Sequence, residues 1–169
     1  MQAYVGRSVG RYAGRDLVTG RSLFAEDAQA KGALVLKVFR SEKHHARILS
    51  IDTAKARNVQ GIAGILTAAD IPGVNQHGVI IKDQPLLAKD KVRFAGEAIA
   101  LVAAENEEAA DEALRALDIQ FEDLPPVFDP ERALLRESAL VHEKGNLLTR
   151  KTICKGDVEE AFRRSDIIL

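Results

Sequence analysis

Few side chains in this 169-residue chain have the types and spacing that catalysis or metal binding requires. Ser41, His45 and Asp52 supply the residue types of a nucleophilic triad, but such a set occurs in many unrelated sequences. The chain also has no GxSxG motif to hold a serine at a strained turn. His44 and His45 are adjacent, so they point to opposite sides of a regular element and chelate poorly. We expect a turn histidine here that donates to a backbone carbonyl.

The remaining candidates for chemistry are weaker. His142 and Glu143 lack the second histidine of an HExxH zinc motif. Cys154 stands beside Lys155, but a lone cysteine without a designated base is generally inert. We therefore expect no catalytic residue, no cofactor-binding residue and no metal ligand in this chain.

Four residues are better candidates for contact with a partner or a cleft than for catalysis. Gly96 precedes an apolar run, where a glycine often marks close backbone approach. Glu97 follows it, and an acid at the mouth of a strand can face a partner. His45 and Arg47 lie in and after a polar turn. The alternative for Gly96 and Glu97 is a plain turn with a solvated acid.

The firmest secondary-structure pattern spans residues 91–122. Residues 97–104 are almost all apolar, residues 106–117 repeat apolar side chains at helical spacing, and residues 118–122 alternate. Asn106 is suited to cap the helix. This predicts strand, helix and strand, with the second strand parallel or next but one to the first and a right-handed connection.

Shorter elements surround this unit. Residues 33–39 and 46–52 read as strands around a polar loop, which suggests a hairpin. A short helix capped by Asp52 or Thr53, a strand at 61–66 and one helical turn at 67–70 follow. The weaker expectations, in order along the chain, are a short strand at 79–81, a turn at 131–135, a helix at 158–164 and a strand beginning at 166–169. The pattern predicts an α+β domain with a mixed β-sheet and flanking helices.

Composition restricts the class of protein. The net charge is −1 with cations scattered among acids, which argues against nucleic acid as a partner. The hydrophobic fraction of 46% is that of a soluble globular protein, and one cysteine excludes an internal disulfide. We find no apolar run long enough to cross a membrane and no signal core, so we expect a cytoplasmic protein. Residues 1–22 read as an extended leader on the domain or on a partner.

Three motifs follow one another along the chain: RSEKHHARI at 40–48, GIAGILTAADIPG at 61–73 and VRFAGEAIALVAAE at 92–105. In type and order they resemble the α/β hammerhead domain of the molybdenum hydroxylases. This domain opens the molybdopterin-binding large subunit of xanthine dehydrogenase, aldehyde oxidase and carbon monoxide dehydrogenase type enzymes. The departures are Glu42 and Lys43 in place of a common proline, Gln60 in place of another, and Glu97 where glutamine is common.

The resemblance implies a hammerhead domain at 1–135, with the leader at 1–22, and an extension at 136–169 toward molybdopterin-binding domains that this chain lacks. It implies a structural and interaction domain, catalytically silent alone. The parent enzyme would carry molybdopterin, with iron-sulfur clusters and FAD on partner subunits or domains, and would hydroxylate a carbon next to a heteroatom or carbonyl. The substrate and the electron acceptor stay open.

Two alternatives from other classes remain. One is a stand-alone small-molecule binding domain that uses a cleft near Gly96 and His45. The other is a complete small enzyme that uses Ser41 or Cys154.

Overall fold

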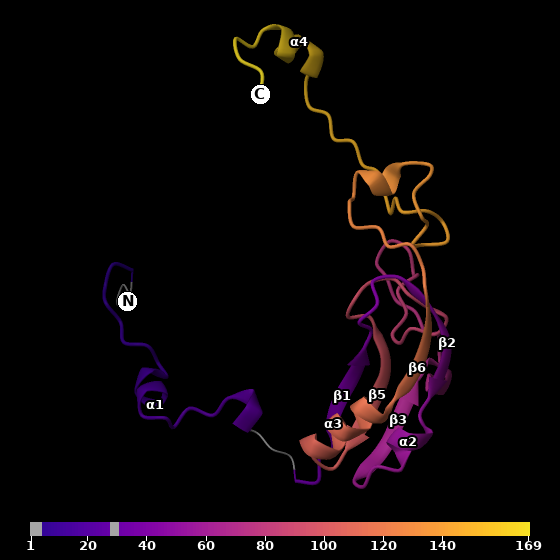
Figure 1. Cartoon of the computed structure of the whole chain (residues 1–169). Coiled ribbons are helices and arrows are strands. Elements are labelled where there is room, and N and C mark those ends of the chain that lie inside the picture. Colours follow the sequence, from indigo (N-terminus) through magenta and orange to yellow (C-terminus); the bar gives the residue numbers. More distant parts are fainter. Residues whose placement is uncertain (1–4, 28–30) are drawn as a thin grey trace.

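A body of two small β-sheets carries an N-terminal arm and a C-terminal tail that lead away from it in the computed structural model (Figure 1). The structure describes residues 5–27 and 31–169. The helices are α1 (Gly14–Val18), α2 (Ala54–Arg57), α3 (Glu107–Ala116) and α4 (Val158–Arg163). The strands are β1 (Val35–Arg40), β2 (Ala46–Asp52), β3 (Ile62–Thr67), β4 (Lys91–Val92), β5 (Ala98–Ala104) and β6 (Asp118–Asp123). Short 3-10 turns lie at Ala25–Asp27, Ala68–Asp70 and Arg132–Leu134.

The α+β class is confirmed, and the strands are divided between two antiparallel sheets where we expected one mixed sheet. Sheet A has the order β1-β5-β3, and sheet B has the order β4-β2-β6. The expected hairpin of β1 and β2 is wrong, because the loop between them carries the chain from sheet A to sheet B. The expectation that the strand after the helix is parallel or next but one to β5 in the same sheet is also wrong, since α3 connects strands of different sheets.

The composition of β5 explains this division. Ile99, Ala100, Val102 and Ala104 are all fully buried, although successive side chains of a strand point to opposite faces. A strand that is apolar on both faces is most stable at the centre of a sheet, where it has a neighbour on each side. β5 therefore pairs with β1 and β3.

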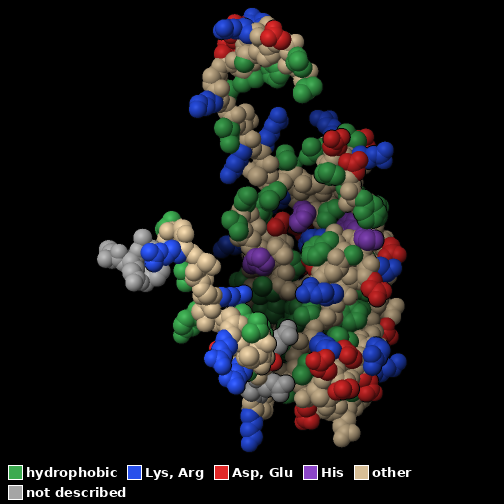
Figure 2. Space-filling view, turned by 90° about the vertical axis from the view of Figure 1, so that its left-hand side faces the viewer, with side chains coloured by type: hydrophobic (Ala, Val, Ile, Leu, Met, Phe, Trp, Pro, Cys, Tyr) green, Lys and Arg blue, Asp and Glu red, His purple; other side chains and the backbone are tan. Residues whose placement is uncertain are grey.

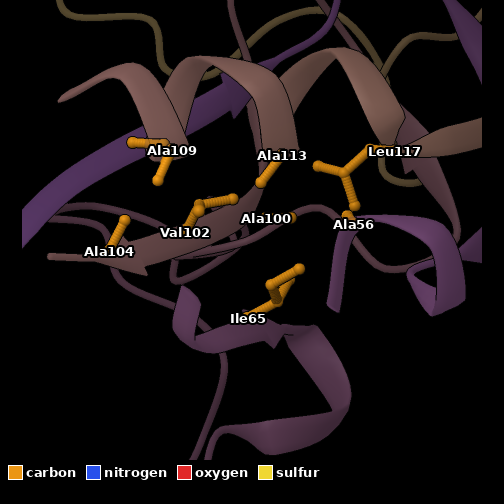
Figure 3. Packing of buried hydrophobic residues seen from close by; sticks show 9 residues of the cluster. Ala56, Ile65, Ala100, Val102, Ala104, Ala109, Ala113 and Leu117 are labelled. Carbon is orange, nitrogen blue, oxygen red and sulfur yellow. The ribbon is translucent and has the colours of Figure 1, made fainter. Parts of the chain in front are cut away.

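Two hydrophobic clusters form the core. The first lies between sheet A and the helices α2 and α3 (Figure 3). Its helical residues Ala109, Ala110 and Ala113 are small, so the backbone of α3 approaches the sheet closely. The second cluster joins sheet B to Ile99 of β5, and Phe39 packs against both clusters.

Hydrogen bonds fix the start of α3 and tie its middle to sheet A. The Asn106 side chain accepts from the Ala109 N–H at 2.8 Å, as the sequence predicted. The Lys37 Nζ of β1 donates to Asp111 Oδ1 at 2.7 Å, which ties the helix to the edge of sheet A. The carboxylate raises the pKa of Lys37, because the bond favours the charged amine.

Other expectations differ in detail. The expected strand at 79–81 is absent, and an isolated bridge joins His77 to Gln84 instead. No strand forms at 166–169. The leader is not wholly extended, since it contains α1; its residues 1–4 lie outside the described residues.

The register of β2 also differs from the alternation that the sequence predicts. A bulge between Ile48 and Ser50 leaves Leu49 exposed and brings Ile48 and Ile51 onto the same cluster. The alternation expected from the sequence placed Ile48 and Ile51 on opposite faces.

We predict that Asn106→Ala lowers the free energy of unfolding by about 1 kcal/mol, because it removes the N-cap acceptor of α3. Urea unfolding of the chain followed by circular dichroism measures the change. Asn58→Ala is the matched control, since the Asn58 side chain makes no hydrogen bond within the described residues. Equal losses in both variants would contradict the role of the cap.

Asp70 provides a pH-dependent contribution to stability. Its Oδ2 accepts from the Thr67 backbone N–H at 2.7 Å and from the Thr67 hydroxyl, and these bonds lower its pKa below 3.8. A lowered carboxyl pKa stabilises the fold above the ordinary pKa, and this contribution is lost as the pH falls through the folded-state pKa. Asp70→Ala should therefore be less stable than the parent chain at neutral pH, and the gap should close by about pH 2. Urea midpoints across that range test this, and a constant gap would contradict it.

Candidate functional site

The turn between β4 and β5 brings together two of the sequence candidates. Gly96 N–H donates to Ser41 O at 2.7 Å, and Ser41 N–H donates to Glu97 O at 2.9 Å. Gly96 has a φ of +99°, which side-chain-bearing residues rarely adopt, while a Cβ at this position would meet nothing within 4 Å. The glycine is therefore required by its backbone conformation and not by a lack of room for a side chain, although the Ser41 backbone does approach it closely.

Glu97 is buried, with 4% of its surface exposed, so the alternative of a solvated acid is wrong. Its Oε2 accepts a hydrogen bond from the backbone N–H of Arg93 at 2.5 Å. Its Oε1 lies 3.5 Å from Arg93 Nη1, an ion-pair distance without a hydrogen bond. A buried carboxylate needs such partners because burial otherwise disfavours its charge. Glu97 thus closes the turn on Arg93.

His45 fastens the segment that leaves sheet B. Its Nδ1 lies 2.7 Å from Pro125 O, and because a carbonyl only accepts, the ring donates. The prediction of a turn histidine that donates to a backbone carbonyl is confirmed. Leu124 N–H donates back to His45 O at 2.9 Å. These two bonds fix the direction in which the chain passes from β6 toward its C-terminal part.

Three buried polar atoms at these turns have no hydrogen-bond partner within the described residues: His45 Nε2, Arg93 Nε and Glu97 Oε1. Since Nδ1 carries the proton in the neutral ring, Nε2 is an acceptor there. The group therefore holds two open acceptors and one open donor.

Arg47 lies apart from the other three candidates. It is exposed, stands opposite Glu122 on β6 and places Nη1 2.5 Å from Glu122 Oε2. Its side chain belongs to the solvent face of sheet B. The structure thus brings His45, Gly96 and Glu97 to one pair of hydrogen-bonded turns and leaves Arg47 outside it.

The residue types of a triad do not assemble. Ser41 Oγ accepts from the Lys43 N–H at 3.0 Å, and Asp52 Oδ1 accepts from the Ala54 N–H at 2.8 Å. With His45 bonded to Pro125, each member stabilises a different turn. Across residues 5–27 and 31–169, no group of three His, Cys, Asp or Glu side chains is placed to hold a metal ion. The described residues thus offer no fit to a metal centre, and we derive no chemical step through one.

A cavity of about 320 Å³ lies beside the turn. Of the four residues expected to contact a cleft or a partner, Glu97 lines this cavity, whereas His45, Arg47 and Gly96 do not. Arg93, Phe94 and Glu97 line one side, and side chains from 81–85 and 142–148 line the other. His142 Nδ1 lies 2.9 Å from Asp83 Oδ2 and closes the far wall. Local pattern could not reveal this cavity, because its walls come from three segments without regular periodicity.

Lysines line a neighbouring cavity of about 390 Å³. Lys91 Nζ donates to Val141 O at 2.7 Å, which holds the C-terminal extension against sheet B. Burial lowers the pKa of Lys91, and the charge of Arg93 lowers it further. Three acidic side chains share the cavity with the five Lys and Arg residues, so it is not a uniform anion site.

The polar side chains at these turns hold segments of the fold in place. The chain belongs to the aldehyde oxidase and xanthine dehydrogenase family: residues 19–125 match the family's a/b hammerhead domain. None of the described helices is long and apolar enough to cross a membrane.

Known relatives are much longer than this chain. A probable xanthine dehydrogenase subunit of Bacillus subtilis (strain 168) is 43% identical over 92% of this chain and 21% of its own length. The nicotinate dehydrogenase large molybdopterin subunit of Eubacterium barkeri is 43% identical over 90% of this chain and 36% of its own. The crystal structure of quinoline 2-oxidoreductase from Pseudomonas putida 86 superposes with a TM-score of 0.84 at 30% identity, over 98% of this chain and 22% of that one.

We predict that the Arg93–Glu97 pair is strongly coupled, whereas the exposed Arg47–Glu122 pair is not. Glu97→Ala should cost roughly 3–5 kcal/mol, because it leaves Arg93 partly buried without its partner. Glu122→Ala should cost at most about 1 kcal/mol, since water screens that pair. Double-mutant cycles in urea measure both couplings. Equal coupling energies would contradict the structural role of Glu97.

Proposed function

We propose that this chain acts as the structural and interaction domain of a molybdenum hydroxylase large subunit and is catalytically silent alone. The observation that carries the proposal is the use of its polar groups: Ser41, His45, Asp52 and Glu97 each hold a turn. We propose a division into a hammerhead domain at 1–135 and an extension at 136–169. The domain's task is to present surfaces to the domains that follow it.

The names of relatives support the parent activity. One relative is a large molybdopterin subunit, and others are aldehyde oxidases and xanthine dehydrogenases. We propose that the parent protein is a cytoplasmic molybdenum-dependent oxidoreductase of this type. Its molybdopterin would be bound by the same subunit beyond this chain, and its iron-sulfur clusters and FAD by partner subunits or domains.

The cavity beside Glu97 favours one rival function. A volume of about 320 Å³ lined by a buried acid could hold a small molecule, as expected for a stand-alone binding domain. Arg93 and Glu97 oppose each other in charge, so such a ligand would be neutral.

Metal analysis separates the proposal from the rival. We expect the natural subunit that contains this sequence to carry about one molybdenum per polypeptide, and the 169-residue chain expressed in the same host to carry none. Inductively coupled plasma mass spectrometry of both proteins measures this. Stoichiometric molybdenum on the short chain would contradict the proposal, and a natural polypeptide that contains no further domain would favour the rival.

The possibility of a complete small enzyme has its own test. If the chain alone turned over a substrate, Ser41→Ala or Cys154→Ala would have to abolish the activity. Glu112→Ala, on the solvent face of α3, is the control for unspecific loss.

A further inference from the structure

The outer face of sheet A is apolar across all three of its strands. Val35, Phe39 and Ile62 pack with the buried β5 residues against α3. Because opposite residues of an antiparallel pair share a face and neighbours along a strand do not, the intervening residues form the other face. Two cross-strand rows result: Leu36, Ala103 and Gly64, and then Val38, Leu101 and Leu66.

This face is uncovered. Leu36 is 60% exposed and Leu66 48%, and neither core cluster contains any residue of the two rows. Ile99, which precedes Leu101 on the same face of β5, is the exception, since it is fully buried against sheet B. One end of this face, at Ile99, is therefore part of the protein core, and no apolar residues of the described chain pack over the rest of it.

The outer face of sheet B differs from the outer face of sheet A. Its outward positions include Arg47, Gln120 and Glu122, while its inward positions are apolar. That is the usual alternation of an antiparallel sheet with one face in water. The outer face of sheet B is thus polar, whereas the two cross-strand rows of sheet A contain no polar residue. Large exposed apolar patches mark interaction sites.

The arm and the tail indicate which polypeptide covers the face. Both lead away from the body of the domain, and the arm lies on the side of β1 (Figure 1). Figure 2 shows hydrophobic side chains gathered in a hollow behind the arm on this side of the molecule. Leu23 and Phe24 of the arm and Ile153 and Phe162 of the tail are exposed. An arm and a tail that carry apolar side chains away from their own domain are suited to pack against another domain.

The length of the solved relatives supports this occupant. The superposition with quinoline 2-oxidoreductase covers 98% of this chain and so extends into the arm and the tail, although it uses 22% of that protein. The arm and the tail therefore follow paths that exist in a much longer polypeptide.

We propose that the outer face of sheet A, centred on Leu36, Leu101 and Leu66, is the docking surface for a domain of the same polypeptide that follows this chain. The inference rests on the proposed function, because it requires a longer subunit. The occupant presents an apolar surface, since the two cross-strand rows contain no charge or hydrogen-bonding side chain to pair. The free edges of β1 and β3 border the same surface.

Cysteine labelling of the natural subunit tests the surface. Leu36→Cys and Leu66→Cys are introduced singly, with Glu112→Cys on the charged face of α3 as the matched control. Each subunit is treated with a maleimide, and peptide mass spectrometry measures the labelling rate at the new cysteine in the native and the urea-unfolded protein. We expect labelling at 36 and 66 to be at least about tenfold slower in the native subunit, because a covered thiol reacts only when the interface opens. Position 112 should label at similar rates in both states.

Native labelling at 36 and 66 as fast as at 112 would overturn the inference. If a cysteine variant fails to assemble, hydroxyl-radical footprinting of Leu36 and Leu66 in the unsubstituted subunit gives the same comparison. The two proposals fail separately: fast labelling in a molybdenum-containing subunit refutes only the docking surface, whereas a natural protein without molybdenum or further domains refutes the proposed function. Protection that appears only at high concentration of the short chain, with a dimer in light scattering, would assign the face to a second copy and overturn the inference.

Discussion

The burial of β5, along its α3 face and at Ile99 on the other face, is the constraint on which the rest of the structure depends. Ala100, Val102 and Ala104 face α3, while Ile99 points the other way into the cluster of sheet B. One strand therefore belongs to both hydrophobic clusters, and the two sheets are held together without sharing a hydrogen bond. The free energy of this arrangement comes from apolar burial, which is roughly proportional to the area removed from water.

The polar turns follow from that constraint. Because β5 enters the core directly, the residues before it must reverse the chain at the edge of the core. Gly96 supplies the backbone conformation, and Glu97 closes the turn by accepting from Arg93. The loop of Ser41 to His45 is paired to the same turn and carries the chain between the sheets. Residues that resemble catalytic types in the sequence are therefore used here as acceptors and donors for backbone groups.

The asymmetry between the two sheets connects the fold to the family. Sheet B alternates apolar and polar residues, so its outer face is polar, whereas sheet A presents apolar residues on both faces. A domain in which one sheet has a polar outer face and the other an apolar outer face is suited to be part of a larger subunit. The match to the hammerhead domain and the short share of each relative that it spans are consistent with this role.

The sequence by itself determined the elements that local interactions specify. Apolar spacing and Asn106 predict a helix over 106–117, and the structure has it at 107–116, since both signals act within a few residues. The strand positions follow from their apolar runs. The family was recognised from the motifs, and His45 was assigned its donor role. Tertiary structure decided how strands pair, because a strand pattern states which face is apolar and not which partner covers it. It also decided that Glu97 is buried, that Arg47 lies apart and that three distant segments enclose a cavity. These outcomes depend on contacts between residues far apart in the chain, which no local pattern contains.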